Sequence, residues 1–346
     1  MKQKLLSLIA AILVLAVLFA GCAGGSGDNK TEDTFRFGMV TDVGGINDQG
    51  FNQSAWTGLQ QLKDELGYDV KYLESSQEAD YASNLDKLAD EELDMIWSIG
   101  FMMQDAAYNA AIQNPELKFG IVDTSYDEIP DNMQCVLFRA QESCFLAGYI
   151  AGRMTQTDHV GFIGAMKSVV IDQFEYGFRS GVAYAAKELG KEIAVDIQYT
   201  ESFTDTAKNK AVSLMMYNNG ADIILPCGAT LGSIEAAKEM NKYAIGIDMD
   251  QNYLAPDNVI TSCMKNVGNV ISQLCKEVAN GNYKGGTVMT FGLAEGAVGL
   301  SPTTDKLVPS DIRADADSVA ALIIDGTIVP PQNESEYDAF IAALGA

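Results

Sequence analysis

Short apolar runs alternate with segments of helical spacing along most of the chain, and this alternation limits the possible folds more than any other feature. The first series of strand-like runs begins at residues 35, 70, 95, 117 and 135, with helical segments between the first four. A second series begins at His159 with "HVGFIGA" and continues with "IAVDIQY", "ADIILPCG", "YAIGIDM" and "VITSCM". Two successive β-α arrays predict an α/β protein with two lobes, each built on a parallel sheet.

The N-terminal segment is typical of a secreted protein. Lys2 and Lys4 precede an apolar run over residues 5–20, and Gly21-Cys22 follows it directly. This order predicts a signal peptide over 1–21 that ends in a motif resembling a bacterial lipobox, with Cys22 as the lipidated first residue of the mature chain. Phe19 stands where Leu is usual, and plain cleavage or a retained anchor are the alternatives. The Gly-, Ser- and charge-rich residues 22–34 predict a flexible tether.

The charge of the chain is strongly negative. Its net charge is −24, and loss of residues 1–21, which contain two lysines and no acids, changes this to −24 − 2 = −26. Such a chain is a poor candidate for binding nucleic acid or an anionic membrane surface. We therefore expect no nucleic acid partner, and a membrane contact only through the lipid on Cys22.

Cysteine and histidine usage argues against a metal centre and against histidine-based catalysis. Five cysteines follow Cys22, without a CxxC pair, and His159 is the one histidine of the sequence. An odd number at irregular spacing is typical of small buried apolar residues and not of a disulfide framework or a zinc site. We expect no cofactor, no metal and no catalytic residues. The five cysteines are Cys135, Cys144, Cys227, Cys263 and Cys275.

Polar residues follow several of the strand-like runs. In open parallel sheets, ligands bind beyond the carboxyl ends of the strands. Two lobes that face each other would therefore bring these residues together around a cleft, an architecture typical of solute-binding proteins. The set is Asp42 with its turn, Gly100-Phe101, Asp123, Lys167, Gly228, Asp248 with Asp250, and Lys265.

The stretch "GFIGAMKS" from Gly161 nearly matches a phosphate-binding loop of the GxxxxGK[ST] type. Met166 stands where the second glycine is required, and without that glycine the backbone cannot wrap a phosphate. The residues therefore disfavour nucleotide hydrolysis.

Two acidic residues two positions apart occur in "GIDMDQ". An EF-hand is excluded because a glycine and a terminal glutamate are missing at the required spacing. A strand-end carboxylate that accepts two hydrogen bonds from a vicinal diol fits better, because an ionised carboxylate is an acceptor only. A role in turning the chain remains open for Asp248 and more so for Asp250. Lys265 could donate to a ligand and offset Asp248, or be an ordinary surface lysine.

The stretch "TDVGGINDQGFNQSAWTGL" predicts a strand end, a glycine-rich turn and a helix. Its glycines permit the turn, and Asn52 is expected to cap a helix that begins at Gln53. Phe51 in this stretch and Phe174 in a later helix could each supply an aromatic wall, one from each lobe, for a flat ring. Packing into the core is the ordinary alternative for both rings.

Several motifs together resemble the basic membrane protein (BMP) family of substrate-binding lipoproteins, over about residues 35–301. They are the stretch from Thr41 to Leu59 together with "FRAQESCFLAGYIAG", "FEYGFRSG", "GIDMDQ" and "TSCMK". The resemblance implies the type I periplasmic-binding-protein fold, with two α/β lobes joined by three crossings and a ligand cleft between them. We expect lobe 1 from about 35–140 and 256–300, and lobe 2 from about 141–255 and 301–346.

The resemblance also implies a function and roles for individual residues. The protein would be an extracytoplasmic, lipid-anchored, monomeric binding protein that delivers a nucleoside, with a purine base, to the permease of an ABC importer. Phe51 and Phe174 would stack on the base, and Asp248 and Lys265 would bind the ribose hydroxyls. The base edge would be bound by Asp42, Asn47 and Asp123, and Gly228 would also lie in the site.

Two other functions are compatible with the residues. The same fold could bind a sugar or another small metabolite, because sugars also stack on aromatic rings. An enzyme, such as a secreted nucleoside hydrolase or phosphorylase that uses the strand-end aspartates, lacks an evident general acid or metal cluster in this sequence.

Overall fold

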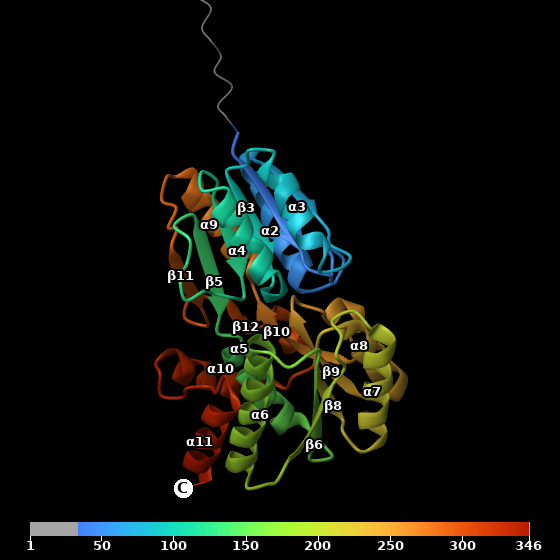
Figure 1. Ribbon diagram of the computed structural model, residues 1–346. Coiled ribbons are helices and arrows are strands. Elements are labelled where there is room, and N and C mark those ends of the chain that lie inside the picture. The colour runs from blue at the N-terminus through green and yellow to red at the C-terminus, as the bar shows by residue number, and fades with distance from the viewer. Residues whose placement is uncertain (1–33, 346) are drawn as a thin grey trace, which may run out of the picture. The chain divides into compact units, whose positions relative to one another are not determined.

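Two six-stranded sheets form the framework of the computed structural model, which describes residues 34–345 (Figure 1). The strands of the first sheet are all parallel, in the order β11-β5-β4-β3-β1-β2. They are β1 (Arg36–Thr41), β2 (Asp69–Leu73), β3 (Met95–Ile99), β4 (Phe119–Val122), β5 (Met133–Phe138) and β11 (Thr287–Phe291). The helices that accompany this sheet are α2 (Phe51–Leu66), α3 (Asp80–Ala89), α4 (Gln104–Gln113) and α9 (Val267–Ala279).

The second sheet has the order β12-β10-β9-β8-β6-β7, and only β12 runs antiparallel to its neighbour. Its strands are β6 (His159–Gly164), β7 (Ala194–Tyr199), β8 (Ile223–Cys227), β9 (Tyr243–Asp248), β10 (Val259–Lys265) and β12 (Val298–Leu300). Its helices are α5 (Ala140–Met154), α6 (Val169–Leu189), α7 (Thr206–Asn218), α8 (Thr230–Met240), α10 (Ser310–Ile324) and α11 (Glu334–Gly345). Short 3₁₀ turns are η1 (Phe101–Met103), η2 (Asn252–Leu254) and η3 (Pro302–Lys306).

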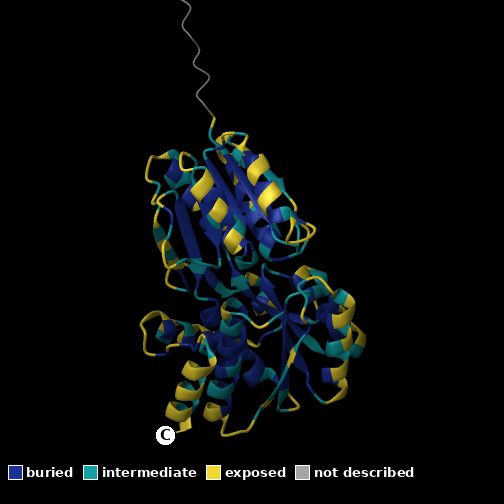
Figure 2. Ribbon diagram, viewed as in Figure 1, coloured by how far each residue is buried: buried dark blue, intermediate teal, exposed yellow. Residues whose placement is uncertain are grey.

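The chain passes between the two sheets three times, after β5, after β10 and between β11 and β12. Lobe 1 is therefore 35–138 with 267–291, and lobe 2 is 140–265 with 298–345. The two mainly parallel sheets and three crossings confirm the fold class expected from the sequence. Together with its helices, each sheet buries its own apolar core, and the exposed residues of the helices lie on their outer faces (Figure 2).

One part of the expected lobe division is wrong. All of 256–300 was expected in lobe 1, but β10 pairs with β9, and β12 pairs with β10, so both strands belong to lobe 2. Only α9 and β11 return to lobe 1, where α9 packs against α2. The run "VITSCM" is equally apolar in either sheet, so its composition carries no information on which sheet it joins.

Residues 1–33 lie outside the described part of the chain, so the predictions for the signal peptide, Cys22 and most of the tether are not addressed by the structure. Within residues 34–345, no helix has both the length and the apolar character needed to cross a membrane.

Candidate ligand-binding site

A pocket with a volume of about 250 Å³ lies between the two lobes, at the carboxyl ends of strands from both sheets. This volume lies just below the usual range for small-molecule pockets, which is about 300–1,000 Å³. Of the eight ligand-binding residues predicted from the sequence, the lining contains Asp42, Asn47, Phe51, Asp123, Gly228, Asp248 and Lys265. Further lining residues from lobe 1 are Asp48, Asn52 and Phe101, and from lobe 2 they are Ile171, Phe203, Thr204, Thr230 and Gln251.

The turn after β1 is held together by hydrogen bonds to two carboxylates. Asp48 accepts bonds from the backbone N–H groups of Gly50 (2.9 Å), Asn52 (2.8 Å) and Gln53 (3.1 Å), which are free at the start of α2. Asn52 was expected to cap the helix, but α2 begins one residue before it, at Phe51. Its buried side chain instead links the two carboxylates, because Nδ2 donates to Asp42 (2.8 Å) and to Asp48 (3.1 Å).

One carboxylate oxygen of Asp42 has no hydrogen-bond partner among the described residues. Its Oδ1 accepts from the N–H of Gly44 (2.9 Å) and from Asn52, whereas Oδ2 takes part in neither bond. Burial raises the pKa of Asp42 to about 6, although the two hydrogen bonds act in the opposite direction. Because Asn52 fixes one oxygen, the other has a defined direction at the base of the pocket.

Lys265, at the end of β10, forms an ion pair with Asp123, which follows β4 of the other lobe. The ammonium group lies 4.7 Å from the centroid of the Phe51 ring and 5.2 Å from that of Phe138, within the range of cation–π attraction. From the sequence, Lys265 was expected to offset Asp248, and Asp123 was expected to bind the edge of the base. In the structure, one oxygen of Asp123 already accepts from the lysine.

Asp248 is a buried carboxylate with unused capacity. It ends β9 with a left-handed backbone conformation (φ 62°), and no hydrogen bond from another described residue reaches its oxygens. Burial raises the pKa of Asp248 to about 7, while nearby Lys265 lowers it. A buried acceptor of this kind is stabilised by a ligand that donates hydrogen bonds to it.

Asp250 has a different role from Asp248. Its Oδ1 accepts from the N–H of Asn252 (3.1 Å) and from the hydroxyl of Thr303 (2.6 Å), and it does not line the pocket. The strand ends at Asp248, so the two side chains do not share a strand face. Asp250 therefore turns the chain, which is the alternative that the sequence left open.

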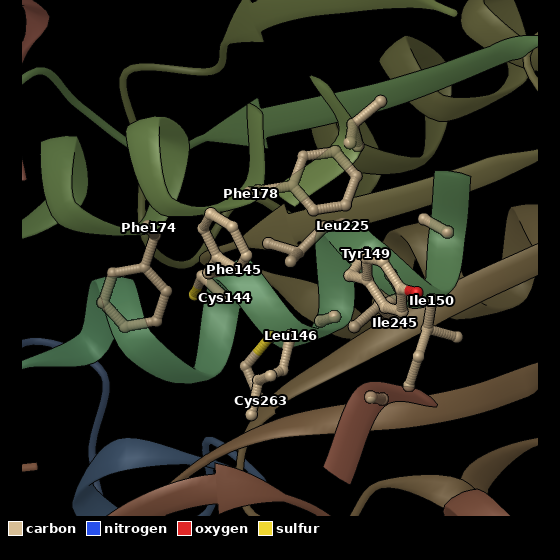
Figure 3. Close-up of a cluster of buried hydrophobic side chains, with 14 of the residues drawn as sticks. Cys144, Phe145, Leu146, Tyr149, Ile150, Phe174, Phe178, Leu225, Ile245 and Cys263 are labelled. Carbon is tan, nitrogen blue, oxygen red and sulfur yellow. The ribbon is translucent and has the colours of Figure 1, made fainter. Parts of the chain in front are cut away.

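The aromatic wall of lobe 2 is Phe203 and not Phe174. Phe174 is buried in lobe 2, with its ring centroid 5.8 Å from Lys265 Nζ, and lies outside the pocket lining. Figure 3 shows it at the edge of the cluster formed by Phe145, Phe178 and other core residues. Helix α6 begins at Val169, so Phe174 lies beyond its first turn, and residues 170 and 171 of that turn line the pocket instead.

Phe203 follows β7, in the loop before α7, and approaches Phe101 of lobe 1 edge-on at 6.2 Å between ring centroids. Gly228 permits this arrangement. Its φ is 112°, and a Cβ atom there would lie 2.7 Å from the Cβ of Ala165 and 3.3 Å from the Phe203 ring. The sequence signal that could have identified Phe203 is its position after a strand, which it shares with the other pocket residues.

Two further predictions are resolved outside the pocket. Lys167 forms ion pairs with Asp172 (2.9 Å) and Glu175 (3.2 Å) in lobe 2 and does not line the pocket. The five cysteines that follow Cys22 are free and buried, as expected. Among residues 34–345, no cluster of three or more His, Cys, Asp or Glu side chains is arranged to hold a metal ion.

Comparison with known proteins identifies the family. Residues 35–334 match the Bmp family, described as ABC transporter substrate-binding protein PnrA-like. The chain belongs to this family. Basic membrane protein A2 of Borrelia garinii subsp. bavariensis is 36% identical over 341 residues, which is 96% of this chain and 98% of that protein. The family assignment confirms the resemblance seen in the sequence motifs.

One further relative and one solved structure show what kind of protein this family contains. The ABC transporter nucleoside-binding protein BmpA of Lactococcus lactis subsp. cremoris is 35% identical over 363 residues, covering 96% of this chain and 99% of that protein. An ABC transporter solute-binding protein from Aeropyrum pernix K1 superposes with a TM-score of 0.81 at 26% identity, over 90% of this chain and 97% of that one. The chain is therefore an ABC transporter substrate-binding protein.

Proposed function

We propose that this protein is the lipid-anchored, extracytoplasmic receptor of an ABC importer, and that its pocket binds a nucleoside with a purine base. The observation that carries the proposal is the combination of aromatic rings with a buried, unpartnered carboxylate in one small pocket. Phe51 and Phe203 offer faces for a flat base, and Asp248 offers two acceptor oxygens for the ribose diol. The name of the Lactococcus relative supports the ligand class.

Polar groups on lobe 1 suit the edge of a base. Asp42 Oδ2 is an acceptor that the other described residues leave free, and the more exposed Asn47 lies at the rim of the pocket. Acceptors of this kind favour a base edge that carries N–H groups. Lys265, which is buried and paired with Asp123, can donate to a ribose hydroxyl as well as to Asp123.

The negative charge of the pocket lining favours an uncharged nucleoside over a nucleotide. Four carboxylates, from Asp42, Asp48, Asp123 and Asp248, face the pocket together with the single ammonium group of Lys265. A phosphate would bring further negative charge into a site with little water, where like charges repel strongly. We therefore expect an uncharged nucleoside to bind and its monophosphate to bind at least about a hundredfold more weakly, a difference of roughly 3 kcal/mol.

Transport requires that the permease distinguish the loaded receptor from the empty one. Contacts from both lobes reach the same pocket, so a ligand bound there favours the arrangement in which the lobes meet. The permease and the monomeric state are part of this proposal, as is the anchor at Cys22.

Mass spectrometry of small molecules released from the purified native protein tests the ligand class directly. A purine nucleoside in stoichiometric amount is the expected result, and a sugar would replace the proposed ligand while keeping the receptor role. Calorimetry with inosine, guanosine, adenosine, uridine and arabinose then ranks the candidates. The nucleosides should remain intact during these titrations, with or without phosphate and divalent metal, and steady release of free base would indicate an enzyme.

The anchor needs a separate experiment. Cells that express the wild-type chain should incorporate a fatty-acid probe into the protein, and Cys22→Ala should abolish the labelling. Equal labelling of both proteins would contradict the lipid anchor without affecting the proposed ligand.

A further inference from the structure

Gln251 is a fully buried polar residue in the loop between β9 and β10. Its side-chain amide makes three hydrogen bonds: Oε1 accepts from the N–H of Ile247 (3.1 Å), and Nε2 donates to the carbonyl of Gln49 (2.9 Å) and to the hydroxyl of Thr230 (3.2 Å). Ile247 and Thr230 belong to lobe 2, whereas Gln49 belongs to lobe 1. One side chain thus joins the two lobes.

The first part of this link shapes the turn that presents Asp248. The bond from Ile247 to Gln251 closes the turn around Asp248, whose backbone is left-handed, and the N–H of Gln251 is itself anchored to the Ser262 hydroxyl of β10 (3.1 Å). Gly246 leaves the space that the side chain needs, since a Cβ atom there would lie 2.9 Å from both Cβ and Oε1 of Gln251. The conformation at Asp248 therefore depends on Gln251.

The second part of the link holds the start of α2. Gln49 has a left-handed backbone (φ 59°) and directly precedes Gly50, the N-cap of α2. Gly50 lies against the carboxylate of Asp248, since a Cβ atom there would be 3.3 Å from Oδ2 of Asp248. The hydroxyl of Tyr253 also donates to the side-chain carbonyl of Gln49. The segment that leads to Phe51 is thus held from lobe 2.

The amide of Gln251 can satisfy these partners in only one orientation. The N–H of Ile247 is a donor only, and the carbonyl of Gln49 is an acceptor only, so a flipped amide would lose both bonds. A shift of the Asp248 turn would therefore displace the Nε2 group from the carbonyl of Gln49 in lobe 1. Separation of the lobes would remove that carbonyl, and Nε2 would lose one of its two acceptors. In a buried site, such an unmade bond is unfavourable.

We propose that Gln251 is a positioning residue that couples Asp248 to lobe closure, so that it governs how long the ligand stays bound. This inference rests on the proposed binding function, but it concerns a residue outside the predicted ligand contacts. The bonds to Gln49 form only when the lobes meet. Their loss should therefore raise the dissociation rate of the ligand and leave the association rate, which is set by the open form, nearly unchanged.

Two substitutions separate coupling from a purely local role in the turn. Gln251→Ala removes all three bonds of the amide. Gln251→Glu keeps an oxygen that can accept from Ile247 but removes the donor to Gln49. Thr303→Val is the matched control, because it removes a bond to the same loop, from Thr303 to Asp250, that stays within lobe 2 and outside the pocket.

Dissociation is measured by chasing radiolabelled inosine from the full-length protein with unlabelled inosine, and affinity by calorimetry. We expect the dissociation rate to rise about tenfold in both Gln251 variants, as for the loss of one or two buried hydrogen bonds. Tyr253→Phe should give a smaller rise, and Thr303→Val should give none. If Gln251→Glu released inosine at the wild-type rate, Gln251 would act only within the turn around Asp248, and the proposal would be overturned.

Lobe distances test the coupling without relying on the identity of the ligand. Nitroxide labels on cysteines introduced at Ser83 of α3 and Lys238 of α8 report the separation of the lobes, and both positions are exposed. The five native cysteines of the described chain are buried, and the parent without added cysteines measures any background labelling. Gln251→Ala and Gln251→Glu should enlarge the population with longer distances.

The two measurements distinguish the two proposals. If wild-type protein binds no nucleoside, the proposed function fails, and the distance distributions of the ligand-free proteins alone decide on Gln251. Distributions of the two Gln251 variants that match the wild type would refute the coupling in that case. A shift toward longer distances in both variants, absent in Thr303→Val, would support it.

Discussion

Lys265 and Asp123 form a buried ion pair that connects the ends of β10 and β4, and so connects the two lobes across the pocket floor. The two side chains are only 3% and 7% exposed. Desolvation of two charges offsets much of their attraction, so the pair adds little net stability, but removal of one partner leaves the other charge unmatched. The pair therefore favours the closed arrangement of the lobes in which both charges are matched. A double-variant cycle can measure the coupling between Lys265 and Asp123.

Lys265→Met should weaken nucleoside binding at least about a hundredfold, because it leaves Asp123 unpaired beside three other carboxylates. Removing one partner of a buried ion pair usually destabilises the structure that contains the pair, here the closed form that holds the ligand, by about 3–5 kcal/mol. Lys265→Met/Asp123→Asn should recover part of this affinity, since neither charge remains. Calorimetry on the wild type, Lys265→Met, Asp123→Asn and the double variant measures the coupling. A double variant as weak as Lys265→Met would instead indicate that the lysine acts on the ligand directly.

Asp248→Ala should distinguish ligands by their sugar. A ribonucleoside should bind at least tenfold more weakly, because it loses charge-assisted bonds worth about 1.5–3 kcal/mol each, whereas its 2′,3′-dideoxy analogue already lacks both hydroxyls. Phe51→Ala should weaken both ligands by similar factors, since stacking does not involve the sugar. Titration of each variant with each ligand completes the comparison, and equal losses for both ligands in a folded Asp248→Ala protein would exclude a ribose contact.

Phe203→Ala and Phe174→Ala should have opposite profiles. Phe203 is partly exposed in the pocket, so its loss should reduce affinity and leave the thermal midpoint nearly unchanged. Phe174 is buried in the core of lobe 2, so its loss should lower the free energy of unfolding by about 3–5 kcal/mol. Calorimetric titration and urea unfolding of both variants check this. A stable Phe174→Ala protein with a large loss of affinity would return Phe174 to the binding site.

Asp248→Asn should stabilise the ligand-free protein at neutral pH. The pKa of Asp248 in the folded protein, about 7, lies above its ordinary value of 3.8, so the folded state holds a proton that the unfolded chain releases. The contribution of this group to stability is full below pH 3.8 and is lost as the pH rises to about 7. The asparagine variant does not titrate there. Its advantage in free energy of unfolding should grow over this range to at most about 4 kcal/mol.

Urea unfolding of wild type and Asp248→Asn between pH 4.5 and 8 measures this difference. Asp42, with a pKa of about 6, titrates in both proteins, and its effect therefore largely cancels in the comparison. A difference that stays constant with pH would mean that Asp248 is hydrated in the ligand-free protein.

The local pattern of the sequence determined the elements and most of the pocket. Alternation of apolar runs with helical segments indicated two β-α arrays, because a strand and a helix bury their apolar faces with different periods. Ligands gather at the carboxyl ends of parallel strands, so a polar residue directly after a strand was a sound guide, and it placed Asp42, Asp123 and Asp248 in the pocket lining before any contact was known.

Tertiary structure alone decided the features that depend on which distant segments meet. Phe203 and not Phe174 lines the pocket because the packing of α6 on lobe 2 directs the Phe174 ring inward. The strand β10 joins lobe 2 through its pairing with β9, although its apolar run would suit either sheet. The bond from Gln251 to Gln49 joins residues 202 positions apart. Local spacing cannot specify such contacts, because they form only when both lobes have folded and closed on each other.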